Sequence, residues 1–252
     1  MNVSELFYSI QGEGRLAGVP SVFVRLAGCD LQCRWCDTPY AQRSEQGEPM
    51  TVSHVLADVL KYNCRHVVVT GGEPLLTLDL PDLLTALSRE GKHITLETSA
   101  TQFRDITCDL VSISPKLSNS LPLGTDNLHY KESIAGVSPA PIEDADGTSA
   151  VQGKCRLNIS AIRNYIDHYD YQLKFVVENE IDLPEIEQVL RQLQNNEKNG
   201  EINRNNVFLM PQAQTRKQHS RLGPRIVQMC LEKGFRYCPR LQIELWDNQR
   251  KR

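Results

Sequence analysis

The feature that most constrains the fold is a repeated alternation of apolar strand-like runs with amphipathic helix-like segments. The strand-like runs are rich in β-branched residues, and the segments between them place apolar residues on one helical face. Because most of these strands are apolar throughout, the pattern predicts a parallel sheet covered by helices. We expect strands at 21–26, 66–70, 93–97, 110–114, 172–177 and 207–210, and helices at 52–60, 80–87, 161–168, 183–193 and 223–233.

The number of strands limits the architecture further. About six parallel strands follow from Ser21 onward, which is too few for a closed eightfold barrel. An incomplete barrel and an open doubly wound sheet both fit, and periodicity alone does not separate them. Residues 117–160 interrupt the alternation with prolines and glycines, which predicts an irregular insertion that is either a functional lid or a surface loop. We interpret 1–252 as a single domain that carries this insertion.

Composition excludes several classes of protein. The chain has 252 residues, a net charge of −3 and 23% charged residues, as expected for an ordinary globular protein without general attraction to nucleic acid or to anionic membranes. No apolar run approaches the roughly 20 residues that span a bilayer, and residues 1–20 lack the apolar core of a secretory signal. We therefore expect a cytoplasmic protein that binds neither nucleic acid nor membrane.

Three of the eight cysteines lie close together, directly after the first predicted strand. Cys29, Cys33 and Cys36 can surround one metal centre in a tight loop, whereas disulfides between them would be strained. A structural zinc site needs four ligands, and no second cysteine pair supplies the fourth. A 4Fe–4S cluster held by three cysteines leaves one iron open, which can bind the amino and carboxylate groups of S-adenosylmethionine. We expect the scattered cysteines to be core residues or inert thiols, namely Cys64, Cys108, Cys155, Cys230 and Cys238.

Several motifs carry a resemblance to a known family. The spacing Cys29-x3-Cys33-x2-Cys36 resembles the signature of the radical S-adenosylmethionine (radical SAM) superfamily, and the Gly-Gly-Glu-Pro sequence at 71–74 resembles its second motif. Four segments make the match more specific, at 8–14 (YSIQGEG), 36–40 (CDTPY), 70–74 (TGGEP) and 114–120 (SPKLSNS). Together they resemble the 7-carboxy-7-deazaguanine synthase family, from about residue 4 to the C-terminal strands and most weakly over 121–160.

The resemblance implies a fold and an activity. The fold would be α/β, an incomplete (β/α)6-type radical SAM barrel with a long insertion. The activity would be a carbon–nitrogen lyase reaction that contracts 6-carboxy-5,6,7,8-tetrahydropterin to 7-carboxy-7-deazaguanine and releases ammonia, in 7-deazapurine and queuosine biosynthesis. A 5′-deoxyadenosyl radical would abstract a hydrogen at C6 of the pterin. The family also implies a 4Fe–4S cluster, S-adenosylmethionine, Mg²⁺, a flavodoxin- or ferredoxin-type reductant and a homodimer.

The resemblance assigns roles to residues near the cofactors, and no catalytic residue beyond the cofactor. Cys29, Cys33 and Cys36 would hold the cluster, and the Thr38 hydroxyl would bind magnesium, which prefers oxygen ligands. Without the resemblance, Asp-Thr-Pro and Ser-Pro-Lys are better interpreted as plain turns, and Trp35 can simply be a packed loop residue. The implied cofactor contacts are Trp35, Cys36, Asp37, Gly72, Glu73, Ser114, Pro115 and Lys116, with 210–212 as a further candidate.

A second group of residues would bind the pterin. Arg25 interrupts an apolar strand four residues before Cys29, and its guanidinium suits two-pronged capture of a carboxylate, although a structural ion pair is the alternative. The family assigns this position to the substrate carboxylate. The remaining implied pterin contacts are Ile10, Gln11, Gly12 and Thr70, with Glu13 and Glu97 as further candidates. Many members end in a proline-containing tail, whereas this sequence ends in 244–252 (ELWDNQRKR), so no C-terminal substrate contact is assigned.

Two other functions remain open. A glycyl-radical-enzyme activase has the same cysteine spacing but acts on a protein partner. A non-catalytic binding module stabilised by zinc or by an iron–sulfur cluster would also need the three thiols. Cleavage of S-adenosylmethionine without pterin turnover would favour the activase, and no cleavage under reduction would favour the module.

Overall fold

The computed structural model describes residues 1–122, 156–194, 201–247 and 249–251. These residues form one nine-stranded sheet in the order β3-β1-β2-β4-β5-β6-β7-β8-β9. The strands are β1 (Asn2–Ile10), β2 (Pro20–Leu26), β3 (Glu48–Pro49), β4 (His66–Gly71), β5 (His93–Thr98), β6 (Leu110–Ile113), β7 (Tyr171–Val177), β8 (Val207–Pro211) and β9 (Arg236–Tyr237).

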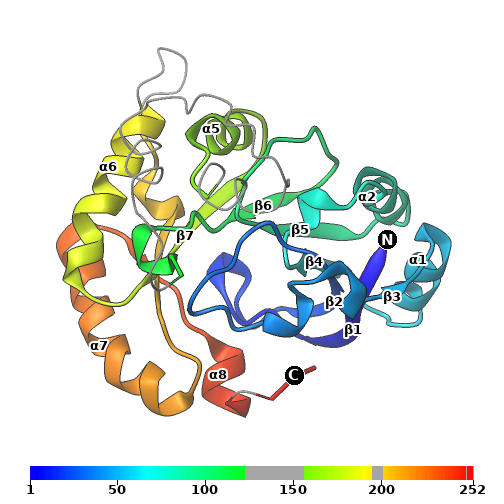
Figure 1. Ribbon diagram of the computed structural model, residues 1–252, viewed down its shortest axis with the longest axis horizontal. Helices are drawn as coiled ribbons and strands as arrows, with labels where there is room; N and C mark the ends of the chain where they lie inside the picture. The colour runs from blue at the N-terminus through cyan, green and yellow to red at the C-terminus, as the bar shows by residue number, and fades with distance from the viewer. Residues whose placement is uncertain (123–155, 195–200, 248, 252) are drawn as a thin grey trace, which may run out of the picture.

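The parallel strands follow one another in sequence order. All neighbouring pairs from β2 to β9 are parallel, whereas β1 is antiparallel to β2 and to β3. Because the order never reverses and crossovers between parallel strands are right-handed, the helices must all cover the same face. Figure 1 shows the helices along the outer side of the curved sheet. The sheet is therefore an open, incomplete barrel rather than a doubly wound sheet, and the predicted fold class is confirmed.

Five helices correspond to predicted segments, one of them with a different start, and the short helix α8 was not predicted. They are α1 (Val52–Leu60), α2 (Leu80–Arg89), α5 (Ile159–His168), α6 (Leu183–Gln194), α7 (Arg216–Lys233) and α8 (Leu241–Trp246). The prediction that α7 begins at Gly223 was wrong, because Thr215 and Gln218 form a capping box at its true start. Pro224 lies inside this helix instead of marking its first turn.

Alternate residues of each strand face opposite sides of the sheet. Val24, Val69 and Leu96 face outward and are completely buried against the helices. Their neighbours in the sequence face inward, and most of them are polar or aromatic. The inward residues include Phe23, Arg25, Thr70, Glu97, Lys174 and Met210, and all of them line one cavity. The outer face of the sheet therefore supplies the core, and the inner face supplies the candidate site.

The first strand lies outside the predicted alternation. β1 pairs with β2 so that Glu5 lies opposite Arg25 and Phe7 opposite Phe23. The two phenylalanine rings stack with their centroids 5.0 Å apart. This register places a carboxylate beside the arginine that the sequence singled out.

Other sequence expectations can be compared with the described part of the chain. No helix there is long and apolar enough to cross a membrane. The cysteines there are free thiols, and Cys64, Cys230 and Cys238 are buried, as expected for small core residues. Cys155 and most of the predicted insertion at 117–160 lie outside the described residues.

A pair of leucines in or near α2 tests this division between core and surface. Leu84 is completely buried, whereas Leu78 is 85% exposed. We expect Leu84→Ala to lower the free energy of unfolding by about 2–5 kcal/mol, because it removes buried methyl groups and leaves a cavity. Leu78→Ala should change it by less than about 0.5 kcal/mol. Urea unfolding followed by circular dichroism measures both, and equal effects would contradict the predicted packing of α2.

Candidate active site

A cavity of about 250 Å³ lies on the inner face of the sheet, at the carboxyl ends of the parallel strands. Parallel α/β folds build their sites at this edge because the loops after successive strands meet there. Glu73 and Pro115 do not line the cavity, and neither does Pro211 of the tentative 210–212 contact. The predicted residues that do line it are Ile10, Gln11, Gly12, Glu13, Arg25, Cys29, Cys33, Trp35, Cys36, Asp37, Thr38, Thr70, Gly72, Glu97, Ser114, Lys116, Met210 and Gln212.

Backbone hydrogen bonds hold the loop that carries the three clustered cysteines. The N–H of Gly28 donates to the carbonyl of Ala41, and that of Cys29 donates to Gln42, both at 2.9 Å. The N–H of Cys36 donates to the carbonyl of Cys33 at 3.1 Å. The thiols are partly exposed and form no disulfide. The fold thus fixes the loop through its backbone and leaves the three sulfur atoms available as ligands.

The surroundings of the thiols fit an iron–sulfur cluster. Among the described residues, no three His, Cys, Asp or Glu side chains converge on one metal position. A zinc ion needs such convergence, whereas a 4Fe–4S cluster binds each cysteine through a different iron. Arg156 is 1% exposed and donates to the Cys33 sulfur, and its Nε and Nη2 find no partner in that part of the chain. A buried, unpaired cation suits an anionic cluster at this position.

A close approach of two loops explains the pair of glycines after β4. The N–H of Gly72 donates to the carbonyl of Leu26 at 3.0 Å, and the N–H of Glu73 donates to that of Gly28 at 2.8 Å. A Cβ atom on Gly72 would lie 2.3 Å from the Gly28 oxygen, which no side chain can tolerate. The end of β4 therefore packs directly against the start of the cysteine loop.

The predicted cofactor contact Glu73 is not among the residues that line the cavity. Its carboxylate accepts hydrogen bonds from the Thr98 hydroxyl at 2.6 Å, from the Ser99 N–H at 2.8 Å and hydroxyl, and from the Leu75 N–H at 3.1 Å. Complete burial raises the pKa of this carboxyl above its usual value, although these hydrogen bonds oppose the rise. The structure therefore places Glu73 as a support that ties the glycine edge to the end of β5.

Trp35 lies in the cysteine loop, and its side chain is packed against neighbouring residues. Its indole N–H donates to the carbonyl of Asn119 at 2.9 Å, and its ring packs against a small apolar cluster. The ammonium of Lys116 lies 5.8 Å from the ring centroid and donates to the Ser114 hydroxyl at 2.7 Å. The members of the apolar cluster are Val176, Phe208, Met210 and Cys238.

Asp37 and Thr38 directly follow Cys36, the last cysteine of the loop. The Thr38 hydroxyl is 3.8 Å from the Cys36 sulfur and faces the cavity. Asp37 is paired with the guanidinium of Arg240. The threonine hydroxyl is thus available to a hard cation such as Mg²⁺, whereas the neighbouring carboxylate already has a cationic partner.

Arg25 is paired yet still presents part of its guanidinium to the cavity. Its Nε donates to Glu5 at 2.8 Å, and the Tyr40 hydroxyl donates to the same carboxylate oxygen at 2.8 Å. Burial alone would raise the pKa of Glu5, but Tyr40 and Arg25 outweigh it and hold the pKa below its usual value. Within the described residues, the two Nη groups of Arg25 have no hydrogen-bond partner. The guanidinium of Arg25 can therefore form an ion pair with Glu5 and bind an anion in the cavity at the same time.

The C-terminal segment contacts Glu5 and Tyr40, which the sequence did not predict. Arg250 donates to the second oxygen of Glu5 at 3.3 Å, and its guanidinium lies 3.7 Å from the centroid of the Tyr40 ring. Neither contact has a local sequence signal, because the partners are separated by most of the chain.

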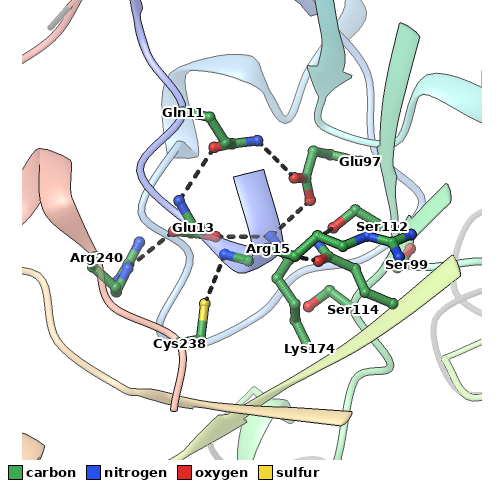
Figure 2. A network of polar contacts seen from close by, with 12 residues as sticks. Gln11, Glu13, Arg15, Glu97, Ser99, Ser112, Ser114, Lys174, Cys238 and Arg240 are labelled. Carbon is green, nitrogen blue, oxygen red and sulfur yellow. Dashed lines mark hydrogen bonds and ion pairs between the residues drawn. The ribbon is translucent and has the colours of Figure 1, made fainter. Parts of the chain in front are cut away.

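A connected set of polar side chains also lines the cavity, and Figure 2 shows its contacts. Gln11 donates to Glu97 at 3.2 Å, and the ammonium of Lys174 contacts Glu97 at 2.7 Å and Glu13 at 2.9 Å. Glu13 also accepts from Arg240 at 3.1 Å and from Gln242 at 2.8 Å. Each carboxylate in this set therefore has a cationic or amide donor.

Burial and charge oppose each other in this network. Burial alone would raise the pKa of Glu13, but Lys174 and Arg240 outweigh it and hold the pKa well below its usual value. Burial alone would lower the pKa of Lys174, but Glu13 and Glu97 hold it above its usual value. The groups are thus charged together at neutral pH.

The sequence analysis missed the two cations of this network. Lys174 interrupts an apolar strand in the same way as Arg25, so the signal that identified one could have identified the other. Arg240 lies just before α8 and has no local signal of its own.

Comparison with known proteins gives consistent matches. Residues 24–131 match the model of the Radical SAM superfamily. The 7-carboxy-7-deazaguanine synthase of Halobacterium salinarum is 39% identical over 98% of this chain and 90% of its own length. That of Rhodopirellula baltica is 37% identical over 98% of this chain and 87% of its own length.

Solved structures share the fold. The crystal structure of QueE from Escherichia coli superposes with a TM-score of 0.63 over 94% of this chain and 92% of that chain, at 23% sequence identity. At this level of identity, the likeness concerns the architecture of the open sheet and its helices.

The ionic network should contribute strongly to stability. We expect Lys174→Met to lower the free energy of unfolding by about 3–5 kcal/mol, because it leaves two largely buried carboxylates without their shared cation. Lys61→Met is the matched control, since Lys61 is exposed and paired only with Asp58, and it should change stability by less than about 1 kcal/mol. Urea unfolding measures both variants. An effect of Lys174→Met as small as that of the control would show that the buried charges are compensated in another way.

Proposed function

The chain belongs to the 7-carboxy-7-deazaguanine synthase family of radical SAM enzymes, and from this premise we propose that it converts 6-carboxy-5,6,7,8-tetrahydropterin to 7-carboxy-7-deazaguanine with release of ammonia. One cavity is lined by the three free thiols, by Arg25, whose Nη groups have no hydrogen-bond partner among the described residues, and by a network of amides and carboxylates. This arrangement carries the proposal, because one cavity offers a cofactor end at the thiols and a polar substrate end at Arg25 and the network. Its product would enter queuosine biosynthesis.

Two alternatives lose support at this point. Family membership makes the chain an enzyme rather than a non-catalytic binding module. A cavity of about 250 Å³ suits a small molecule, whereas an activase must admit a segment of a protein partner. The pterin proposal therefore agrees better with the site than the activase does.

The cofactor end would hold a 4Fe–4S cluster through Cys29, Cys33 and Cys36, with S-adenosylmethionine beside it. When bound and reduced, these groups supply a 5′-deoxyadenosyl radical, which is chemistry that no side chain can perform. The chain positions the cofactor with the backbone edge at Gly72 and with the polar groups of Ser114 and Lys116. The enclosing strands keep water away from the reacting atoms.

The substrate end matches the polar groups of a carboxylated pterin. The end of the Arg25 guanidinium remains free to bind the carboxylate, because Glu5 occupies only its Nε side. An ionised carboxylate can only accept hydrogen bonds, so Glu13 and Glu97 suit the amino and ring N–H donors of the pterin. Gln11 and Thr70 can both donate and accept, which suits the remaining ring atoms.

The remaining expectations stay predictions. Thr38 supports a magnesium site because its hydroxyl faces the cavity beside the cysteine loop. Radical SAM enzymes act with a reductant, and a flavodoxin- or ferredoxin-type protein is our proposal for its identity. A homodimer, a cytoplasmic location and a single domain over 1–252 are likewise predictions from the sequence.

Anaerobic turnover tests the proposed function directly. We expect the chain, reconstituted with iron and sulfide and supplied with dithionite, S-adenosylmethionine, Mg²⁺ and the carboxytetrahydropterin, to form 7-carboxy-7-deazaguanine detectable by mass spectrometry. The triple variant Cys29→Ala, Cys33→Ala, Cys36→Ala should lose both cluster absorption and cofactor cleavage, because its ligands are gone. Cys230→Ala, a buried thiol outside the cavity, should retain both. Cleavage without the deazaguanine would refute the pterin as substrate.

Arg25 separates substrate binding from radical formation. Arg25→Lys keeps the charge but loses the planar pair of donors, so we expect the apparent KM for the pterin to rise about tenfold or more. Slow cleavage of S-adenosylmethionine without substrate should persist, since the cysteine loop is unchanged. Arg225→Lys is the control, because Arg225 is exposed and pairs with Glu180 on the surface. A normal KM together with lost cofactor cleavage would show that Arg25 faces the cofactor instead.

A further inference from the structure

Arg156 is a charged side chain in an unusual place. It lies just before α5 and beside the cysteine loop, and it is the largest side chain that the structure buries almost completely. Charged residues of this kind are rarely fully buried without a partner of opposite charge. In the described residues, no carboxylate forms an ion pair with it.

The contacts of Arg156 lead to one of the three clustered thiols. Its Nη1 lies 3.3 Å from the Cys33 sulfur, and the same nitrogen donates to the Ser120 hydroxyl at 2.8 Å. The carbonyl of Ser120 in turn accepts the N–H of Arg34 at 3.1 Å. The guanidinium is therefore held in a fixed position against the cysteine loop.

Two other nitrogens of the Arg156 guanidinium, Nε and Nη2, carry further N–H donors. Nε and Nη2 are buried, and neither has a hydrogen-bond partner in the described part of the chain. A buried cation whose donors are unsatisfied is strongly unfavourable by itself. Three metal-bound thiolates at Cys29, Cys33 and Cys36 would supply negative charge next to this cation.

From this geometry we propose that Arg156 is a positioning residue that raises the reduction potential of the cluster held by the three cysteines. Its N–H donates to the Cys33 thiolate, and its positive charge lies within the same buried region. Each electron that enters the cluster adds negative charge, so a fixed cation stabilises the reduced form more than the oxidised form. The proposal rests on the cluster that family membership implies and is independent of the pterin.

A redox titration tests this role without substrate or S-adenosylmethionine. The chain is reconstituted anaerobically with iron and sulfide, and the midpoint potential is read by electron paramagnetic resonance during reduction with dithionite. We expect Arg156→Gln and Arg156→Met to shift the midpoint to more negative values, with Met at least as far as Gln, because both lose the charge and Met also loses the donor.

The matched control is another arginine of the same region. Arg163 on α5 also has a buried, unpartnered Nε, but it donates to the carbonyl of Gln192 and not to the cysteine loop. Arg163→Met therefore makes the same chemical change away from the cluster and should leave the midpoint unchanged.

Each outcome decides the proposal. A wild-type midpoint in either neutral Arg156 variant with full iron content would overturn it, and so would a failure of both to fold, since the guanidinium would then serve the fold. If the neutral variants fold but bind no iron, recovery of iron binding in Arg156→Lys supports the proposal, because the charge is restored. Failure of Arg156→Lys to bind iron overturns it.

Discussion

The carboxylate of Glu13 joins the two ends of the open sheet. Glu13 follows the first long strand, β1, and its partners Lys174 and Arg240 come from β7 and from the segment after β9. In a closed barrel, backbone hydrogen bonds between the first and last strands would join these ends, whereas here buried ionic side chains do so. Such a set is stable only when every member is present, because a remaining charge would be buried without compensation. The groups that hold the barrel together are thus the groups that line its cavity.

The division between outward and inward residues explains how far the sequence could predict the fold. The outward residues of each strand and the apolar face of each helix repeat regularly, so the parallel strands β2 and β4 to β8 and most helix boundaries were correctly predicted, whereas the two-residue strand β9 was not. β1 was not predicted, because it begins Asn2, Val3, Ser4 and carries Glu5 inward, which weakens the apolar signal. The start of α7 was placed wrongly, because Gly223 and Pro224 suggest a helix start, whereas the capping box around Thr215 defines the real one.

The site was predictable only where its residues are neighbours in sequence. The cysteine loop and the glycine edge at Gly72 are local motifs, and both line the cavity as expected. Arg240 and Arg156 enter the site through tertiary contacts with residues far along the chain, so no local pattern marks them. Glu73 shows that a local motif can also mislead. Its motif indicates a cofactor contact, but hydrogen bonds from the end of β5 occupy its carboxylate. A motif identifies the loop, and packing decides which of its atoms face the ligand.

The Lys174 network and the cysteine loop differ in how their charge is balanced. In the network, Lys174 is flanked by Glu13 and Glu97, so its charge is paired within the protein. At the cysteine loop, the cation of Arg156 is buried, and two of its nitrogens have no hydrogen-bond partner among the described residues. Thiolates bound to iron supply the missing negative charge, and a ligand that binds only the folded chain stabilises it by mass action. The Lys174 network is therefore paired within the protein, whereas the buried cation of Arg156 would gain a partner of opposite charge from the cluster, which would couple assembly of the cluster to the stability of the loop that holds it.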